Sequence, residues 1–311
     1  MGVRREPVMS TPSWIPSIIK ERQSLSPYTT MKIGGIARFF SVVHTVEDLL
    51  ECIRFSQQQS LPLFVIGKGS NLIVGDGCID AVFVVNRIGG VLLKDDRVKV
   101  GAGVNASYLS QKISKMGYGG LEFFSGIPGT VGGCVVMNAG AQQKEVKDIL
   151  LEVETIDPFG NFCHYSRDDL KFGYRTSPFK GKKEVIVSLT FKVYEDQMAE
   201  EKRVSILKKR LDTQPYTVPT AGCMFKNPIG ASAGQLIDRC GLKGLQIGGV
   251  KVSSKHANFF ENNHNATAQN VLDLIERVRY EVKIKTGIDL ELEVIPCFTT
   301  CTPTLQHPTV S

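Results

Sequence analysis

The stretch 126–141 reads GIPGTVGGCVVMNAGA and holds five glycines and one proline within sixteen residues. Glycine adopts positive φ readily and lets a ligand approach the backbone closely. Successive N–H groups of such a turn can converge on an anion, and Asn138 adds a side-chain amide near the end of the stretch. Two interpretations remain open, a phosphate-binding turn or a plain glycine-rich bend between strands, and the rest of the chain must decide between them.

Composition limits the class of protein. The chain has 311 residues, 42% of them hydrophobic, which is enough for two or three globular units. It has no run of eighteen apolar residues and no signal-peptide pattern at its start, so we expect a cytoplasmic protein with no membrane contact. A monomer is our separate expectation for its oligomeric state. The net charge of +6 is dispersed without an aromatic-basic stripe. This pattern favours anionic small molecules over nucleic acid as partners.

The cysteines do not form a recognisable framework. No C-x-x-C pair is present, and no histidine stands at ligand spacing. We therefore expect reduced thiols, no disulfides and no metal site. The eight positions are Cys52, Cys78, Cys134, Cys163, Cys223, Cys240, Cys297 and Cys301.

A second glycine turn, GKGSN at 67–71, follows a predicted strand at 62–66 and precedes another at 81–85. Ligands of α/β sheets usually bind at the carboxyl ends of strands. An ordinary connection between two strands is the alternative interpretation of this turn.

A third glycine motif, at 101–106, matches the G-x-G-x-x-A fingerprint of dinucleotide-binding folds and precedes a predicted helix at 108–116. The acidic residue that this fingerprint requires about twenty positions later is missing, because Glu122 lies too close. We therefore do not interpret this motif as a Rossmann site.

Hydrophobic periodicity predicts the remaining elements. The helix at 200–212 should bury Val204, Leu207 and Leu211, and the change of composition near residue 198 indicates a domain boundary. Alternation in the last strand places Glu291 and Glu293 on one face, where a solvated carboxylate is the usual case. Further strands are predicted at 36–43, 150–157, 161–166, 184–194 and 288–296, and further helices at 46–57, 233–244 and 267–286.

Three other residues have ordinary interpretations when they are taken one at a time. The adjacent Tyr174 and Arg175 lie on a predicted loop, where surface packing is more common than chemistry. Cys223, in the turn PTAGCMFKNP, is most simply a small buried apolar residue.

Taken together, the motifs resemble one family. The stretches are GKGSN, GIPGTVGGCVVMNAGA, YRTS at 174–177, AGCMFKNP at 221–228, IGGVKVSSKHANF at 247–259 and ELEV at 291–294. In this order they are similar to UDP-N-acetylenolpyruvoylglucosamine reductase, the flavoenzyme family that completes UDP-N-acetylmuramate for bacterial peptidoglycan. The resemblance spans about residues 25–296 and favours the family's second type, which lacks an extra tyrosine-bearing loop.

The resemblance implies an α+β fold. It would comprise an FAD-binding region of the vanillyl-alcohol-oxidase (PCMH) type at 22–197, in two subdomains of about 22–86 and 87–197, and a substrate-binding α+β domain at 198–298. A mobile arm at 1–21 and a disordered tail at 299–311 would flank these domains.

The resemblance also implies the chemistry. In this family NADPH reduces a non-covalently bound FAD, whose N5 delivers hydride to C3 of the enolpyruvyl ether. Arg175 and Glu293 would then stabilise the enolate-like intermediate, and Cys223 would protonate C2. Substrate would contact Tyr174, Lys226 and Asn227, and no metal is involved. The residues expected to hold FAD are Gly67, Lys68, Gly69, Ser70, Asn71, Gly126, Pro128, Gly129, Thr130, Gly132, Gly133, Asn138, Ala139 and Gly140.

Two positions depart from the family pattern. The usual proton donor is serine; a thiol with an unperturbed pKa of about 8.5 is the better acid, so the role of Cys223 survives the change. The usual lysine before Pro215 is missing, and Lys208, Arg210 or Lys226 could compensate for it. Two other functions remain open, an FAD-dependent oxidase or dehydrogenase of the same fold acting on another substrate, and a non-catalytic regulator that binds flavin or a nucleotide sugar.

Overall fold

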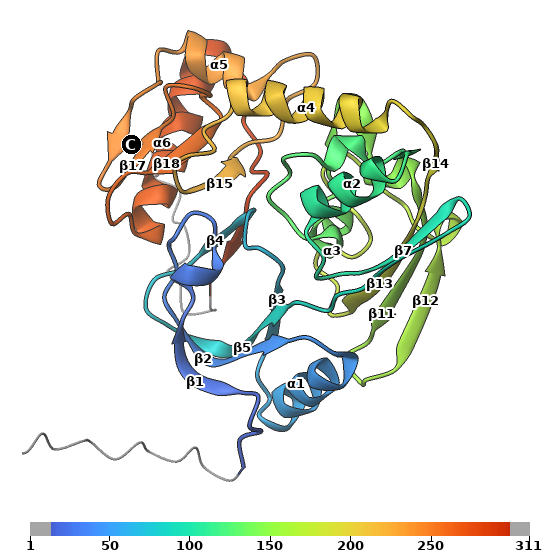
Figure 1. Cartoon of the computed structure of the whole chain (residues 1–311). Helices are drawn as coiled ribbons and strands as arrows, with labels where there is room; N and C mark the ends of the chain where they lie inside the picture. The colour runs from blue at the N-terminus through green and yellow to red at the C-terminus, as the bar shows by residue number, and fades with distance from the viewer. Residues whose placement is uncertain (1–13, 299–311) are drawn as a thin grey trace, which may run out of the picture.

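The structure is a computed structural model that describes residues 14–298. Its first sheet is formed by the N-terminal part of the chain (Figure 1). Its strand order is β1-β2-β5-β3, with β5 parallel to both β2 and β3. Helix α1 packs against it and begins with a capping box in which Thr45 and Asp48 bind each other's backbone N–H groups. The elements are β1 (Lys20–Ser24), β2 (Ile36–Val43), α1 (Val46–Gln58), β3 (Leu63–Ile66) and β5 (Cys78–Asn86). The predictions of strands near 36–43, 62–66 and 81–85 and of a helix from 46 are confirmed.

The predicted arm at 1–21 is wrong for its last part. Ile15 and Ile19 are buried in the core beneath α1, Trp14 stacks on Phe55, and β1 begins at Lys20. Burial of these apolar side chains anchors the segment. Residues 1–13 of the predicted arm lie outside the described residues, as does the predicted tail at 299–311.

The second sheet is antiparallel throughout, with the order β12-β11-β13-β7-β6. Helices α2 and α3 belong to the same part of the molecule, and α3 contacts both β7 and β13. Because β7 lies in an antiparallel sheet, the motif at 101–106 is not a Rossmann turn. The bounds are β6 (Val91–Lys94), β7 (Arg97–Gly101), α2 (Ala106–Lys115), α3 (Val131–Val136), β11 (Leu150–Ile156), β12 (Phe162–Ser166) and β13 (Val185–Lys192).

The C-terminal part combines a four-stranded antiparallel sheet of order β15-β18-β17-β16 with helices α5 and α6. Helix α6 starts at the Thr267 cap and ends at Gly287, whose φ of 74° is left-handed, and it buries its predicted apolar face. The bounds are α4 (Ala199–Thr213), β15 (Thr220–Cys223), α5 (Ala233–Arg239), β16 (Gln246–Ile247), β17 (Val250–Val252), β18 (Phe259–Asn262) and α6 (Ala268–Thr286).

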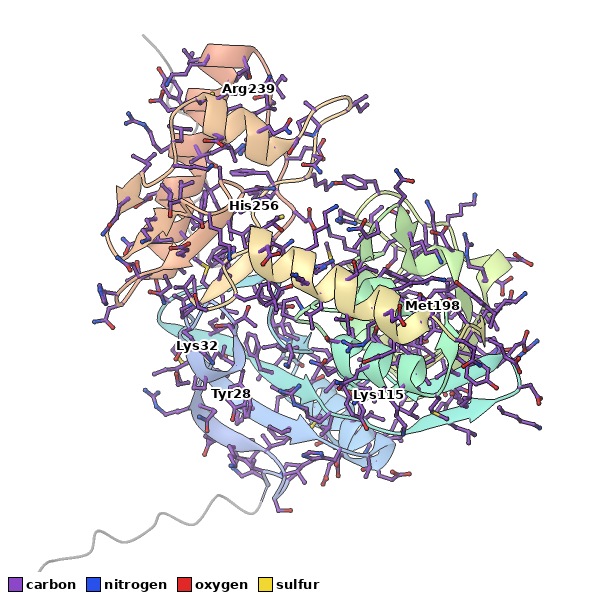
Figure 2. All side chains as sticks on the ribbon, turned by 45° about the horizontal axis from the view of Figure 1, so that its top comes forward. Tyr28, Lys32, Lys115, Met198, Arg239 and His256 are labelled. Atoms are coloured by element: carbon purple, nitrogen blue, oxygen red, sulfur yellow. The ribbon has the colours of Figure 1, made fainter. Side chains whose placement is uncertain are left out.

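Helix α4 does not bury the predicted face. Val204 and Leu211 are 48% and 46% exposed, whereas Ala199 and Arg203 are buried. The helix crosses from α2 toward the C-terminal part, with Met198 at its start and the region of His256 near its other end (Figure 2). Helix α4 connects the second subdomain with the C-terminal part, and only a narrow face of it is buried. Its hydrophobic periodicity therefore does not determine which of its residues are buried.

The predicted strand at 288–296 is mostly irregular. Only β19 (Ile295–Cys297) is a strand, and it lies parallel to β4 (Leu72–Val74). The preceding residues pair with the segment after β15, because Glu293 N–H donates to Met224 O and Lys226 N–H donates to Glu291 O, each at 2.8 Å. The short strands not yet named are β8 (Tyr118–Gly119), β9 (Gly140–Ala141), β10 (Lys144–Glu145) and β14 (Tyr194–Glu195).

The chain's last part is fastened to its first. Besides the pairing of β19 with β4, the Asp76 carboxylate accepts hydrogen bonds from the N–H groups of Ala268 and Gln269 at 3.0 and 3.2 Å. These groups open α6 and have no partner within the helix. Among residues 14–298, no helix is both long and apolar enough to cross a membrane.

Candidate active site

The first glycine turn, at 67–71, offers free backbone donors. Within the described chain, the N–H groups of Lys68, Gly69 and Ser70 donate to no acceptor. Gly69 has a φ of 62°, and a Cβ there would collide with the Tyr28 carbonyl. Glycine is therefore required at this position, and the three amides are available to an anion.

The stretch 126–141 offers fewer donors than its sequence indicates. The N–H groups of Gly126, Val131, Gly132 and Gly133 already donate within the second subdomain, for example Gly132 to Ala102 O at 3.0 Å. In the described chain only the N–H groups of Gly129 and Thr130 remain free in the turn itself. The prediction of a broad amide cradle is therefore corrected to these two donors, and the other glycines serve close packing.

The two glycine turns touch each other. A Cβ on Gly67 would collide with Thr130 Oγ1, and one on Gly129 would lie 3.7 Å from Ser70 Oγ. A cavity of about 90 Å³ opens at this contact, lined by Gly67, Thr130, Gly132 and Gly133 among others, which is room for part of a dinucleotide. A larger hollow of about 450 Å³ beside β6 and β7 contains none of the predicted site residues.

Asn138 is not available to a cofactor. Its amide donates to Glu145 Oε2 at 3.1 Å and to Gly173 O at 2.9 Å, and its Oδ1 accepts from Lys147 N–H at 3.1 Å. The predicted cofactor role is therefore corrected: Asn138 holds the loop that carries Arg175. Ala139 N–H is likewise bound, to Cys134 O at 2.8 Å.

Arg175 and Glu293 form an ion pair although 118 residues separate them. Arg175 Nε donates to Glu293 Oε1 at 2.9 Å, and Arg175 Nη2 reaches Gly140 O at 3.5 Å. The guanidinium also lies 5.0 Å from the Tyr174 ring. Burial raises the pKa of the Glu293 carboxyl, and Arg175 opposes this shift. The loop and the last segment of the chain therefore meet at one point.

Cys223 completes this group. It ends β15, directly after Gly222 with a φ of 79°. Burial, followed by the nearby Glu293 carboxylate, raises the pKa of the Cys223 thiol to about 12, whereas Arg175 and Arg210 lower it. The fold therefore raises the Cys223 pKa above that of an unperturbed thiol, and the three predicted catalytic residues lie together.

The group adjoins the first glycine turn. Asn71 Nδ2 donates to Glu293 O at 3.1 Å, and Ile295 N–H donates to Asn71 O at 2.9 Å. A Cβ on Gly222 would lie 3.6 Å from Ser70 O. The turn at 67–71 therefore packs directly against the two segments that carry Glu293 and Cys223.

Two of the predicted substrate residues, Lys226 and Asn227, already have partners within the protein. Lys226 Nζ pairs with Glu291 Oε2 at 3.0 Å, and Asn227 Oδ1 accepts from Ala233 N–H at 3.0 Å. Lys226 still affects the site, because it lowers the pKa of Lys180.

Sequence reasoning missed two members of the site and left a third undecided. Lys180 is half-buried, and its pKa is lowered by burial and by Lys226, while Glu293 raises it. The side chain of Arg210 comes within 3.0 Å of where a Cβ on Gly126 would lie, and Tyr216 OH donates to Gly126 O. Lys208 is exposed on α4. The position of Lys180 three residues after YRTS was the available signal, whereas nothing local marks Tyr216.

Comparisons with known proteins identify both halves of the chain. Residues 214–296 match the model of "UDP-N-acetylenolpyruvoylglucosamine reductase, C-terminal domain", and residues 37–166 match "FAD binding domain". The predicted α+β fold class is confirmed.

Proteins similar to the whole chain carry the same name. The UDP-N-acetylenolpyruvoylglucosamine reductases of Chlamydia pneumoniae and Chlamydia muridarum are 42% and 44% identical to it over 92% and 90% of this chain and 94% of their own. The crystal structure of that reductase from Thermus caldophilus superposes with a TM-score of 0.76 at 35% identity, covering 89% of this chain and 98% of its own.

Proposed function

The chain belongs to the UDP-N-acetylenolpyruvoylglucosamine reductase family, and we propose that it uses NADPH and bound FAD to reduce UDP-N-acetylglucosamine enolpyruvate to UDP-N-acetylmuramate for peptidoglycan synthesis. The observation that carries the proposal is the meeting of Arg175, Cys223 and Glu293 beside a turn with free amides. An oxidase that shares the FAD-binding fold would need the turn but not these three groups.

The glycine turns fit the diphosphate of FAD. The amides of 68–70, with those of Gly129 and Thr130, are unpaired in the described chain, and the two turns that carry them lie against each other. When bound, FAD would supply the redox chemistry, receiving two electrons from NADPH and passing them to the substrate's carbon–carbon double bond.

Arg175 would orient the substrate carboxylate and offset the negative charge that develops next to it. A charged Glu293 would repel that charge. Burial raises the pKa of Glu293, so its protonated, neutral form is more populated than that of an exposed glutamate. This form can donate a hydrogen bond.

Cys223 would protonate C2 of the substrate. A pKa of about 12 keeps the thiol protonated at neutral pH, so the proton is always present, and the thiol is still a stronger acid than an alkyl hydroxyl. Arg175 and Arg210 lower this pKa, which means that they stabilise the thiolate left after transfer.

For the missing family lysine we propose Arg210, because it reaches Gly126 while Lys208 points to solvent. Lys180 and Lys226 would add positive charge near the substrate's anionic groups.

We further propose a domain boundary between residues 197 and 198, with the segment from Ile15 included in the first domain, and a monomeric cytoplasmic enzyme. The second subdomain has its own core within residues 98–193. Most of the C-terminal core lies within 221–294, although Met31, Ile33 and Ile73 join it.

The experiment follows the two half-reactions by stopped-flow absorbance of the FAD-loaded protein. NADPH should reduce the flavin, and UDP-N-acetylglucosamine enolpyruvate should reoxidise it. The Cys223→Ala variant should keep the first step and lose at least about a hundredfold in the second, while Cys223→Ser retains measurable turnover.

Other outcomes would reject the proposal. Reduction without reoxidation by this substrate would favour an oxidase or dehydrogenase acting on another compound, and a protein that takes up no FAD, or whose flavin NADPH cannot reduce, would favour a regulator. Equal loss of both steps in Cys223→Ala would make Cys223 structural.

A further inference from the structure

The segment after Cys223 is held by one buried residue that nothing above places in the site. Asn258, 2% exposed, precedes β18. Its main-chain O accepts from Met224 N–H at 2.8 Å, its Oδ1 accepts from Phe225 N–H at 3.0 Å, and its Nδ2 donates to Phe225 O at 2.8 Å. Three hydrogen bonds from one residue thus fix the two residues that follow Cys223.

These contacts continue the strand pairing at a point where the backbone pairing of the sheet has ended. Strand β15 pairs with β18 through Thr220 and Cys223, with a register shift between them. Beyond Cys223 the side-chain amide of Asn258 presents an acceptor and a donor to Phe225, as a neighbouring strand would. The backbone of this turn therefore depends on a side chain, and its position is sensitive to that side chain.

Asn258 is itself held in place. Its N–H donates to His256 Nδ1 at 3.3 Å, in the region of the His256 label in Figure 2. Burial lowers the pKa of His256, which keeps the imidazole neutral so that Nδ1 can accept this bond. A Cβ on Gly234 would lie 3.1 Å from His256 Cε1, so α5 packs closely against the ring.

The other members of the site have anchors of their own. The Glu293 side chain is held by Arg175 and its carbonyl by Asn71, and its N–H donates to Met224 O in the turn that Asn258 fixes. The Asn258 side chain also lies near enough to the Cys223 thiol to lower its pKa. Asn258 therefore acts directly on the segment that carries Cys223, and it reaches Glu293 only through the Met224 backbone.

We infer that Asn258 is a positioning residue, which aims the Cys223 thiol at the substrate by fixing the turn 223–225. This inference rests on the proposed function. It predicts that loss of Asn258 slows proton delivery while leaving flavin reduction unchanged.

The test is a double-mutant cycle on the FAD-loaded protein with NADPH and UDP-N-acetylglucosamine enolpyruvate. Asn258→Ala should slow flavin reoxidation by about 10- to 100-fold when Cys223 is present, and by less than about 3-fold in the Cys223→Ala background. Flavin reduction by NADPH should stay within about 2-fold in all four proteins.

The matched control is Asn262→Ala. Asn262 is the last residue of β18, which Asn258 precedes, and it also binds backbone groups, donating to Met31 O at 2.9 Å and accepting from Ala266 N–H at 3.2 Å. The Asn262→Ala variant should lower the melting temperature by a few degrees, as Asn258→Ala should, and should leave both half-reactions within about 2-fold.

A second variant covers a failure of Asn258→Ala to fold. Asn258→Asp has nearly the same shape, keeps the acceptor for Phe225 N–H and loses the donor, so it should slow reoxidation in the same direction. The inference is overturned if the Asn258 substitution costs the same factor with and without Cys223, or if Asn262→Ala slows reoxidation equally. A wild-type protein that the substrate cannot reoxidise would instead overturn the proposed function.

Discussion

Glu293 and Glu291 stand two positions apart and differ in environment. The Glu293 side chain is 18% exposed and bound to Arg175, whereas that of Glu291 is 75% exposed and bound to Lys226. If Glu293 stabilises the developing charge, Glu293→Ala should slow flavin reoxidation by about a hundredfold to a thousandfold. Glu293→Gln can still donate a hydrogen bond and should lose less.

Glu291→Ala is the control for this prediction. An exposed ion pair contributes little to stability. Its loss should therefore change both the activation free energy of reoxidation and the free energy of unfolding by less than about 0.5 kcal/mol. Stopped-flow traces of the three variants decide the matter. A damaging Glu291→Ala beside a silent Glu293→Ala would contradict the assignment of the site.

The two glycine turns lie in close contact, and we expect this contact to affect FAD binding. A methyl group on Gly67 would collide with Thr130 Oγ1, which caps α3 by accepting from Gly133 N–H. Gly67→Ala must therefore displace Thr130 or separate the turns, and we expect at least about tenfold weaker FAD binding. Titration of the apoprotein with FAD, followed by fluorescence, measures this.

Gly89→Ala is the matched control for the turn. A Cβ there meets no atom closer than 3.9 Å, and its φ is not in the left-handed region. FAD affinity should stay within about 2-fold. Equal affinities for the Gly67→Ala and wild-type proteins would show that the turns do not hold the cofactor.

For the molecule as a whole, buried thiols predict the response to alkaline pH. Burial raises the pKa of Cys52 to about 11, whereas an unfolded thiol ionises near 9. Between these values the unfolded state loses its proton and the folded state keeps it, so stability falls as pH rises. Each such thiol contributes up to about 1.4 kcal/mol per pH unit.

Cys52→Ala should therefore flatten the loss of unfolding free energy between about pH 9 and pH 11, even though the cavity it leaves lowers stability at pH 7. Urea unfolding at several pH values measures the slope. Cys78→Ala, at an exposed position, should leave the slope unchanged. An unaltered slope in Cys52→Ala would refute this account.

Local patterns were sufficient where a segment carries its own signals. The hydrophobic periodicity of 267–286 predicted α6, because the period of a helix depends on residues within a few positions, and the structure adds the Thr267 cap. The family resemblance, and no local pattern, predicted that Arg175, Cys223 and Glu293 share one site.

Tertiary structure alone decided which of these groups are free and how strongly they ionise. The free amides lie mainly at 68–70, because most of those in 126–134 are used within the second subdomain. The chain from 288 to 294 is irregular, because its partner is the turn after Cys223, which Asn258 holds from the other side. The Cys223 pKa of about 12 results from burial beside Glu293, seventy positions away. Hydrogen-bond partners and desolvation come from distant segments, so no local pattern contains them.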